Sequence, residues 1–171
     1  TTVRGMLGYP HQLQLKSDIE SGKRLGPTLY LAGPSFSGNT IESVEQVTER
    51  VIAQRDEGWD LLKVHPGLTL EEYEAMASTA RQADMDFAGH VPAEVGLKRA
   101  MEAGQRTIDH LDGYLAYVDA MNREITQDEL DLLVAMTLEH DVAVVPTQAL
   151  WKTLIGAANP NKLKDYPEIQ L

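Results

Sequence analysis

The chain contains no cysteine. This absence excludes disulfides, thiolate metal sites and cysteine nucleophiles from whatever the protein does. It does not decide the compartment, because many exported proteins lack disulfides too, and localisation therefore stays open. The sequence also lacks a Gly-x-Ser-x-Gly segment, so a serine nucleophile presented on a sharp strand-to-helix turn is not expected.

Long apolar runs and positive charge are also scarce. No stretch approaches the roughly 18 consecutive apolar residues of a membrane-spanning helix, so we expect no membrane span. The first residues, Thr1 to Arg4, include neither an initiator methionine nor the features of a signal peptide, and we expect the native N-terminus to lie further upstream. With 26 acidic and 15 basic residues the net charge is -11, which repels phosphate backbones and argues against a nucleic-acid partner.

The remaining sequence has a regular alternation of two patterns. Hydrophobic residues make up 43% of the chain, enough for one well-buried core. Short, continuous apolar runs alternate with amphipathic helical patterns, as expected when helices cover a parallel sheet. The sequence therefore predicts an α/β fold with right-handed crossovers. Strands are expected at residues 1–3, 29–32, 60–64, 85–90, 106–110 and 142–145, and a break in the pattern follows at 159–162.

Capping signals mark the expected helices. Thr69 with Glu72 and Thr126 with Glu129 have the spacing of capping boxes, so a helix should begin after each threonine. Other helices are expected over 41–58 and 94–103, with a short helical insertion at 114–118. The two capped helices carry apolar stripes, formed by Leu70, Tyr73, Met76, Ala77 and Ala80 in the first and by Leu130, Leu133, Val134 and Leu138 in the second.

Basic side chains recur at the ends of three successive apolar runs. Lys63 follows Leu61-Leu62, while His90 and His110 close the next two runs. In a barrel of parallel strands the catalytic groups project from the carboxyl ends of the strands, so these three side chains should converge on one site. Taken singly, each has an ordinary structural explanation: a lysine along a sheet edge, or a hydrogen-bonded loop histidine.

A lysine among metal-binding histidines makes chemical sense only if it loses its positive charge. Reaction of the Lys63 amine with carbon dioxide would give a carbamate, whose carboxylate can bridge two divalent ions. Burial would help by lowering the pKa of the lysine. His90 and His110 would bind the second ion, and a metal-activated water would attack the substrate.

Four short strings together resemble a known family. Thr1-Thr2-Val3-Arg4, Leu61 to Val64, Phe87 to Val91 and Thr107 to His110 are similar to the second, fourth, fifth and sixth strands of the amidohydrolase superfamily. The resemblance extends over nearly the whole chain, and the most similar branch is that of imidazolonepropionase-like and prolidase-like metal-dependent hydrolases. It implies a partial (β/α)8 TIM barrel, approximately strands 2 to 7 with their helices. Residues 1–171 would then be a single incomplete barrel domain that lacks the first and last strands.

The resemblance also implies an activity and a set of ligands. Lys63 would be a carboxylated lysine bridging two metal ions, with His90 and His110 as ligands of the second ion. The expected cofactors are one or two divalent metal ions, most simply zinc. The expected reaction is hydrolysis of a C–N bond in an amide, a cyclic amide or a dipeptide-like small molecule.

Some of the family pattern has no counterpart in this sequence. The family's His-x-His pair on the first strand and the aspartate ending its eighth strand are both missing, so no catalytic residue is assigned. Gly5 stands where the family has an aspartate after the arginine. We therefore expect the fragment alone to be inactive. Its two open sheet edges favour association, which makes a homo-oligomer an expected state.

Two further residues are predicted to contact substrate. His65 follows Lys63 by two positions and should share its face if the strand continues. Tyr114 lies on the loop above the strand that ends at His110. Asp109 precedes that histidine directly, so strand alternation predicts that it points to the opposite face and pairs with a helix.

Two other interpretations of the sequence are open. One is a metal-free, doubly wound α/β enzyme that uses its histidines for acid–base chemistry, which requires a switch in strand order and histidines on opposite sides of it. The other is a non-catalytic remnant or binding module that kept the barrel segments and lost the metal. Metal content distinguishes the hydrolase from the remnant.

Overall fold

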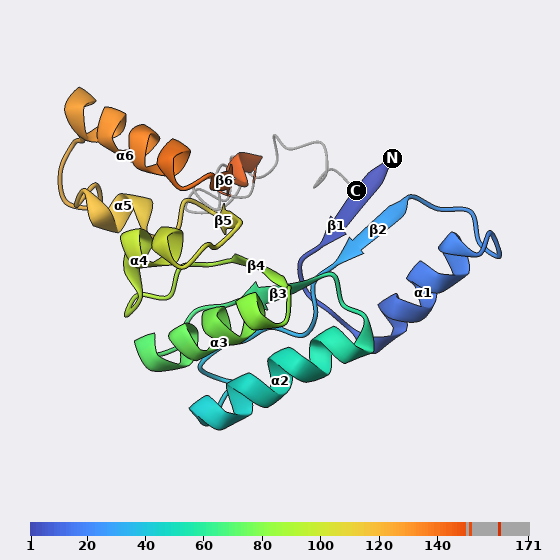
Figure 1. Ribbon diagram of the computed structural model, residues 1–171. Helices are drawn as coiled ribbons and strands as arrows, with labels where there is room; N and C mark the ends of the chain where they lie inside the picture. The colour runs from blue at the N-terminus through green and yellow to red at the C-terminus, as the bar shows by residue number, and fades with distance from the viewer. Residues whose placement is uncertain (150, 152–160, 162–171) are drawn as a thin grey trace.

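The computed structural model describes residues 1–149, 151 and 161. These residues form an α/β domain in which strands and helices mostly alternate (Figure 1). The strands are β1 (Thr2–Gly5), β2 (Thr28–Leu31), β3 (Leu61–Val64), β4 (Asp86–Gly89), β5 (Thr107–Asp109) and β6 (Ala143–Val145). The helices are α1 (Pro10–Glu20), α2 (Val44–Glu57), α3 (Leu70–Gln82), α4 (Gly96–Glu102), α5 (Tyr114–Tyr117) and α6 (Gln127–Glu139). The break predicted at 159–162 lies, apart from Asn161, outside the described residues.

The strands are all parallel and follow one another in chain order. β1 pairs with β2, and β3, β4, β5 and β6 form a second ladder in that order. Isolated parallel bridges from Ala32 to Leu61 and from Phe36 to Val64 connect the segment after β2 to β3. No change of strand order occurs within the described part of the chain. This is the order of a β/α barrel and not that of a doubly wound sheet.

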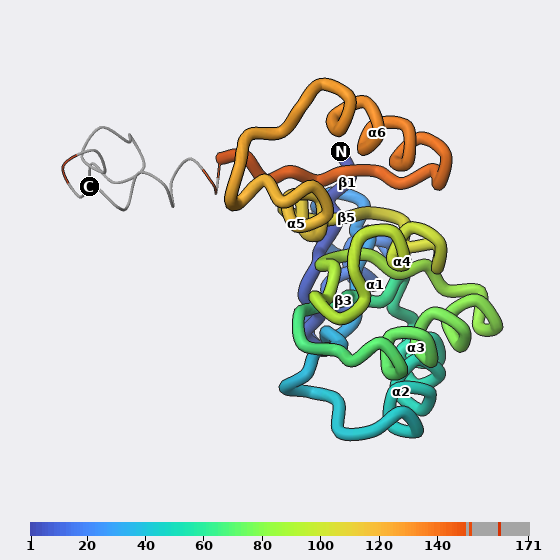
Figure 2. The backbone as a smooth tube through the Cα atoms, turned by 90° about the vertical axis from the view of Figure 1, so that its left-hand side faces the viewer, coloured from blue at the N-terminus to red at the C-terminus, as the bar shows by residue number. Residues whose placement is uncertain are grey.

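The strands curve so that the first approaches the fifth. Nη1 of Arg4, on β1, donates a hydrogen bond to Oγ1 of Thr107, on β5, at 3.3 Å, and Nη2 of Arg4 lies 3.8 Å from a carboxylate oxygen of Asp109. Helices α2, α3 and α4 lie together on one side of the strands in both ribbon and tube views (Figure 2). The opposite side of the curved strands is concave and carries the contact of Arg4 with Thr107 and Asp109.

Local sequence signals account for most helix boundaries. Both predicted capping boxes form, with Thr69 at the start of α3 and Thr126 at the start of α6. Helix α2 ends at Glu57 and is followed by Gly58, whose left-handed φ of 91° is typical of a glycine C-cap. Helix α4 begins at Gly96, two residues later than the sequence predicted. None of the described helices is long and apolar enough to cross a membrane.

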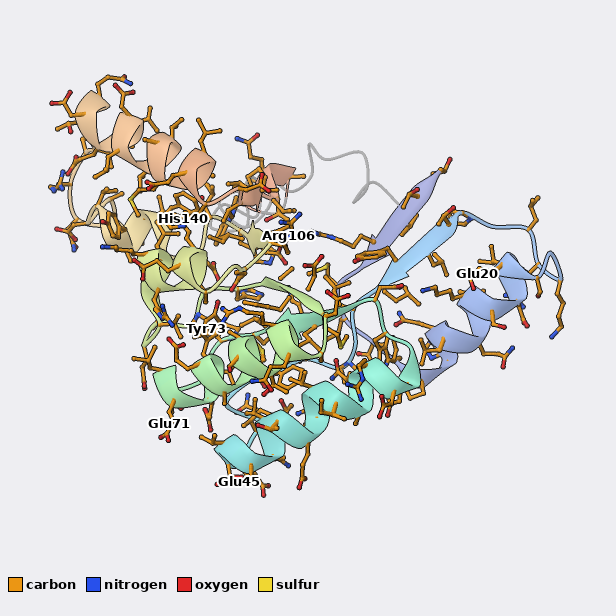
Figure 3. The ribbon with its side chains drawn as sticks, viewed as in Figure 1. Glu20, Glu45, Glu71, Tyr73, Arg106 and His140 are labelled. Carbon is orange, nitrogen blue, oxygen red and sulfur yellow. The ribbon has the colours of Figure 1, made fainter. Side chains whose placement is uncertain are left out.

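Helix α3 buries the apolar stripe that the sequence predicted, except for its first residue, Leu70. Tyr73 on this helix is fully buried, and its hydroxyl donates to the Gln105 side chain at 2.8 Å. Glu71 and Glu45, by contrast, point away from the strands (Figure 3). Helix α3 is thus fixed against the strands that carry the predicted site.

The apolar stripe of α6 is mostly exposed. Only Leu133 of its four residues is buried, and Leu138 is 75% exposed. Periodicity predicts an apolar face but not what covers it, and within the described residues that face stays largely uncovered.

Candidate active site

Lys63 is buried on the concave side of the sheet. All four residues of β3 are buried, and Lys63 is only 4% exposed. Its Nζ donates to Oδ2 of Asp109 on β5 at 2.6 Å, and both side chains lie within the molecule. A buried ammonium needs a paired anion, and Asp109 provides it.

The position of Asp109 corrects the expectation that it would point away from the other polar residues. Register explains its orientation: Val64 pairs with Gly89, and Gly89 pairs with Ile108. These three residues form one row across the sheet. Lys63 lies one residue before this row on β3, and Asp109 lies one residue after it on β5. Since side chains alternate between faces with a period of two, both lie on the same face.

Three histidine rings surround the same space. The ring centroids of His65 and His90 are 4.7 Å apart, as are those of His90 and His110. His65 and His90 follow the ends of their strands on the face of Lys63. His110 would be expected on the other face, but it and Leu111 have left-handed φ values of 63° and 62°. This turn in the backbone brings the His110 ring back to the site.

Each of the two predicted histidine ligands is held through one ring nitrogen. Nδ1 of His90 lies 2.7 Å from Oδ2 of Asp112, and Nδ1 of His110 lies 2.6 Å from Oγ1 of Thr147. No described residue forms a hydrogen bond with Nε2 of either ring. The pattern of one anchored and one unengaged nitrogen is the one that metal-binding histidines show in proteins.

The pKa values of His65 and Asp112 are shifted by burial and by the charged groups of the site. Burial, and then the charges of His90 and Lys63, lower the pKa of His65, which favours its neutral form. Burial raises the pKa of Asp112, but the hydrogen bond with His90 and the charges of His90 and His110 outweigh it, so the net pKa is below the usual value. At neutral pH Asp112 is therefore an ionised acceptor.

These side chains line one cavity of about 390 Å³. Its walls are formed by Arg4, Met6, Leu7, Lys63, His65, His90, Asp109, His110, Val145 and Thr147. The structure thus brings together Lys63, His90, His110 and the predicted substrate contact His65. A larger but shallow surface hollow near Met121 and Ile125 contains none of these groups.

Tyr114 is not part of this group. It is buried at the start of α5, and its hydroxyl hydrogen-bonds the Thr137 side chain on α6 at 2.7 Å. Burial raises the pKa of its hydroxyl. The side chain is engaged between two helices and does not line the cavity, so its position gives no support to the predicted substrate contact.

Sequence reasoning missed the roles of four residues. Arg4 was noted only as part of a motif, Asp109 was expected on the opposite face, and Asp112 was given no role. A signal that could have found Asp112 is its position: it follows His110 by two residues, so a turn after the strand places both residues at the strand end. Thr147 had no such signal, because its contact depends on where β6 ends.

The donor set fits part of a divalent metal site. Imidazole nitrogens suit zinc and similar ions, and the two unengaged Nε2 atoms belong to adjacent rings. Among the residues that the structure describes, no group of three histidine, cysteine or acidic side chains could hold a metal ion. A complete ligand set therefore requires a modified Lys63 or donors beyond these residues.

No protein-family model matches the sequence, and no curated protein matches it. Solved structures do resemble it. A bottromycin amidohydrolase superposes with a TM-score of 0.67 at 22% identity, over 86% of this chain and 35% of its own. A Xaa-Pro dipeptidase with bound methionine gives 0.69 at 22% identity, over 99% of this chain and 47% of its own. The ochratoxinase of A. niger superposes with a TM-score of 0.68 at 16% identity, over 93% of this chain and 44% of its own.

These similarities establish the fold. The chain shares its fold with part of each of these structures, and its parallel, sequentially ordered strands agree with the partial β/α barrel that the sequence predicted. It spans less than half the length of each of these three structures.

Proposed function

We propose that this chain forms the central part of a metal-dependent hydrolase that cleaves C–N bonds in an amide, a cyclic amide or a dipeptide-like small molecule. The observation that carries the proposal is the convergence of Lys63, His90 and His110 on one cavity. The names of the similar structures, an amidohydrolase and a Xaa-Pro dipeptidase, support the same class of bond.

In this proposal the two histidines hold one ion through their unengaged Nε2 atoms. One or two divalent ions, most simply zinc, would supply an acidified water and polarise the substrate carbonyl. Lys63 would join the ligand set as a carbamate. Its ammonium would first lose one proton to solvent, the Nζ lone pair would bond to the carbon of carbon dioxide, and a second proton would leave Nζ for solvent, which gives –NH–COO⁻. His65 and Arg4 line the same cavity and are placed to contact a substrate.

The remaining parts of the site come from outside these 171 residues in this proposal. A His-x-His pair and a strand-end aspartate would complete the ligand and proton-transfer groups that the family resemblance implies. The isolated chain would therefore bind metal weakly and turn over no substrate.

The test is the Lys63→Ala variant of the full-length protein, compared with Lys98→Ala. Lys98 is exposed on α4, so its removal should leave the site intact. We expect Lys63→Ala to abolish metal binding and turnover of dipeptide substrates, with Lys98→Ala unchanged. Undiminished turnover in Lys63→Ala would rule out the proposed role.

A second measurement keeps the test decisive if Lys63→Ala folds poorly. The parent protein supplied with ¹³C-labelled carbon dioxide should show a carbamate signal by NMR, and its absence from fully metal-loaded protein would contradict the modified lysine. A parent protein that holds no metal after growth in metal-replete medium would instead support the non-catalytic remnant.

A further inference from the structure

The turn that follows β5 connects the two histidine ligands. The backbone N–H of Asp112 donates to the carbonyl of Asp109 at 3.1 Å, closing a turn around His110 and Leu111. Both enclosed residues have positive φ, a conformation that side chains other than glycine rarely adopt. Strained turns of this kind persist where the surrounding structure holds them, and they are concentrated at functional sites.

The turn is packed tightly on the loop that carries His90. Gly113, which follows Asp112, has a φ of 79°, and a Cβ atom at this position would lie 3.2 Å from side-chain atoms of Val91 and Leu97. One short segment therefore presents His110 to the cavity and places the Asp112 carboxylate 2.7 Å from Nδ1 of His90.

The chemistry of this contact determines which nitrogen of His90 carries the proton. An ionised carboxylate has no proton to donate, so Nδ1 of His90 must be the donor. The neutral ring then keeps its lone pair on Nε2. The Thr147 hydroxyl beside His110 can donate or accept, so it imposes no such choice.

We propose that Asp112 is a positioning residue that fixes the tautomer and orientation of His90, so that the Nε2 lone pair faces the cavity. The strained turn thereby couples the two histidines, since it carries one and anchors the other. The metal-binding part of this inference rests on the proposed function, whereas the tautomer part does not.

The first test uses the metal-free parent chain labelled with ¹⁵N in its histidines. NMR correlation of ring nitrogens with ring carbon-bound protons identifies the protonated nitrogen, and a His90→Gln variant assigns the signals. At a pH where the ring is neutral we expect a proton on Nδ1 of His90 and none on Nε2. A proton on Nε2 in the parent would overturn the proposal.

The second test compares Asp112→Ala with Asp128→Ala, which removes an exposed carboxylate on α6. In Asp112→Ala we expect His90 to lose its fixed tautomer. We also expect zinc affinity, measured by titration with Zn²⁺ alone, to fall about 10- to 100-fold. Asp128→Ala should retain the parent values. An unchanged tautomer in folded Asp112→Ala would contradict the proposal, as would an unchanged zinc affinity in a parent that binds zinc.

The outcomes separate this inference from the proposed function. A full-length protein that binds no zinc yet shows Nδ1-protonated His90 would contradict the proposed function and leave Asp112 as the residue that sets the tautomer. If circular dichroism shows that Asp112→Ala does not fold, the spectrum of the parent still decides the question.

Discussion

At the scale of single residues, the site depends on backbone conformations that only a few side chains tolerate. Gly89, at the end of β4, has a φ of 131°, a region open almost only to glycine. A Cβ atom there would lie 2.4 Å from the carbonyl oxygen of Val64 and 3.0 Å from Nζ of Lys63. The absence of a side chain at Gly89 is what gives the buried lysine its space.

We predict that Gly89→Ala destabilises the protein by clearly more than the roughly 1 kcal/mol expected for a positive φ alone. Gly22→Ala is the matched control, because Gly22 also has a positive φ but a Cβ there would meet nothing within 4 Å. Urea unfolding measures both variants. If both variants lose the same free energy of unfolding, crowding against Val64 and Lys63 contributes nothing.

At the scale of elements, local signals predicted more than long-range ones. The capping boxes at Thr69 and Thr126 form because each involves only neighbouring residues. The six strands and their parallel arrangement also follow from short apolar runs separated by helical patterns. These elements required no knowledge of what packs against them.

The errors have a common physical origin in tertiary context. Asp109 was assigned to the wrong face because the alternation was counted from His110, whose positive φ interrupts it. The exposure of the α6 stripe was not predicted, because periodicity does not reveal what covers an apolar face. The Thr147 contact of His110 joins residues 37 positions apart, so no local pattern could predict it.

The cap of α3 gives a prediction at this scale. Thr69→Ala removes the side-chain acceptor for the backbone N–H of Glu72 and should lower the free energy of unfolding by about 1 kcal/mol. Thr48→Ala, on the exposed side of α2, should have little effect. Thermal or chemical unfolding followed by circular dichroism measures the difference, and a Thr69→Ala variant as stable as the parent would contradict the role of the cap.

At the scale of the whole molecule, the order and curvature of the strands create the site. Lys63 lies next to the last residue of β3, and His90 and His110 directly follow β4 and β5, so these neighbouring parallel strands bring all three side chains to one cavity. The contact of Arg4 with β5 shows that the curved sheet already brings distant strands together.

Anomalous X-ray diffraction at the zinc edge, from crystals of the protein grown with zinc, would show directly whether Lys63, His90 and His110 bind a metal ion. We predict an anomalous peak bonded to Nε2 of both His90 and His110, next to a Lys63 side chain with density for a carbamate. No zinc peak at these rings, or a peak bonded elsewhere while Lys63 stays unmodified against Asp109, would contradict this prediction.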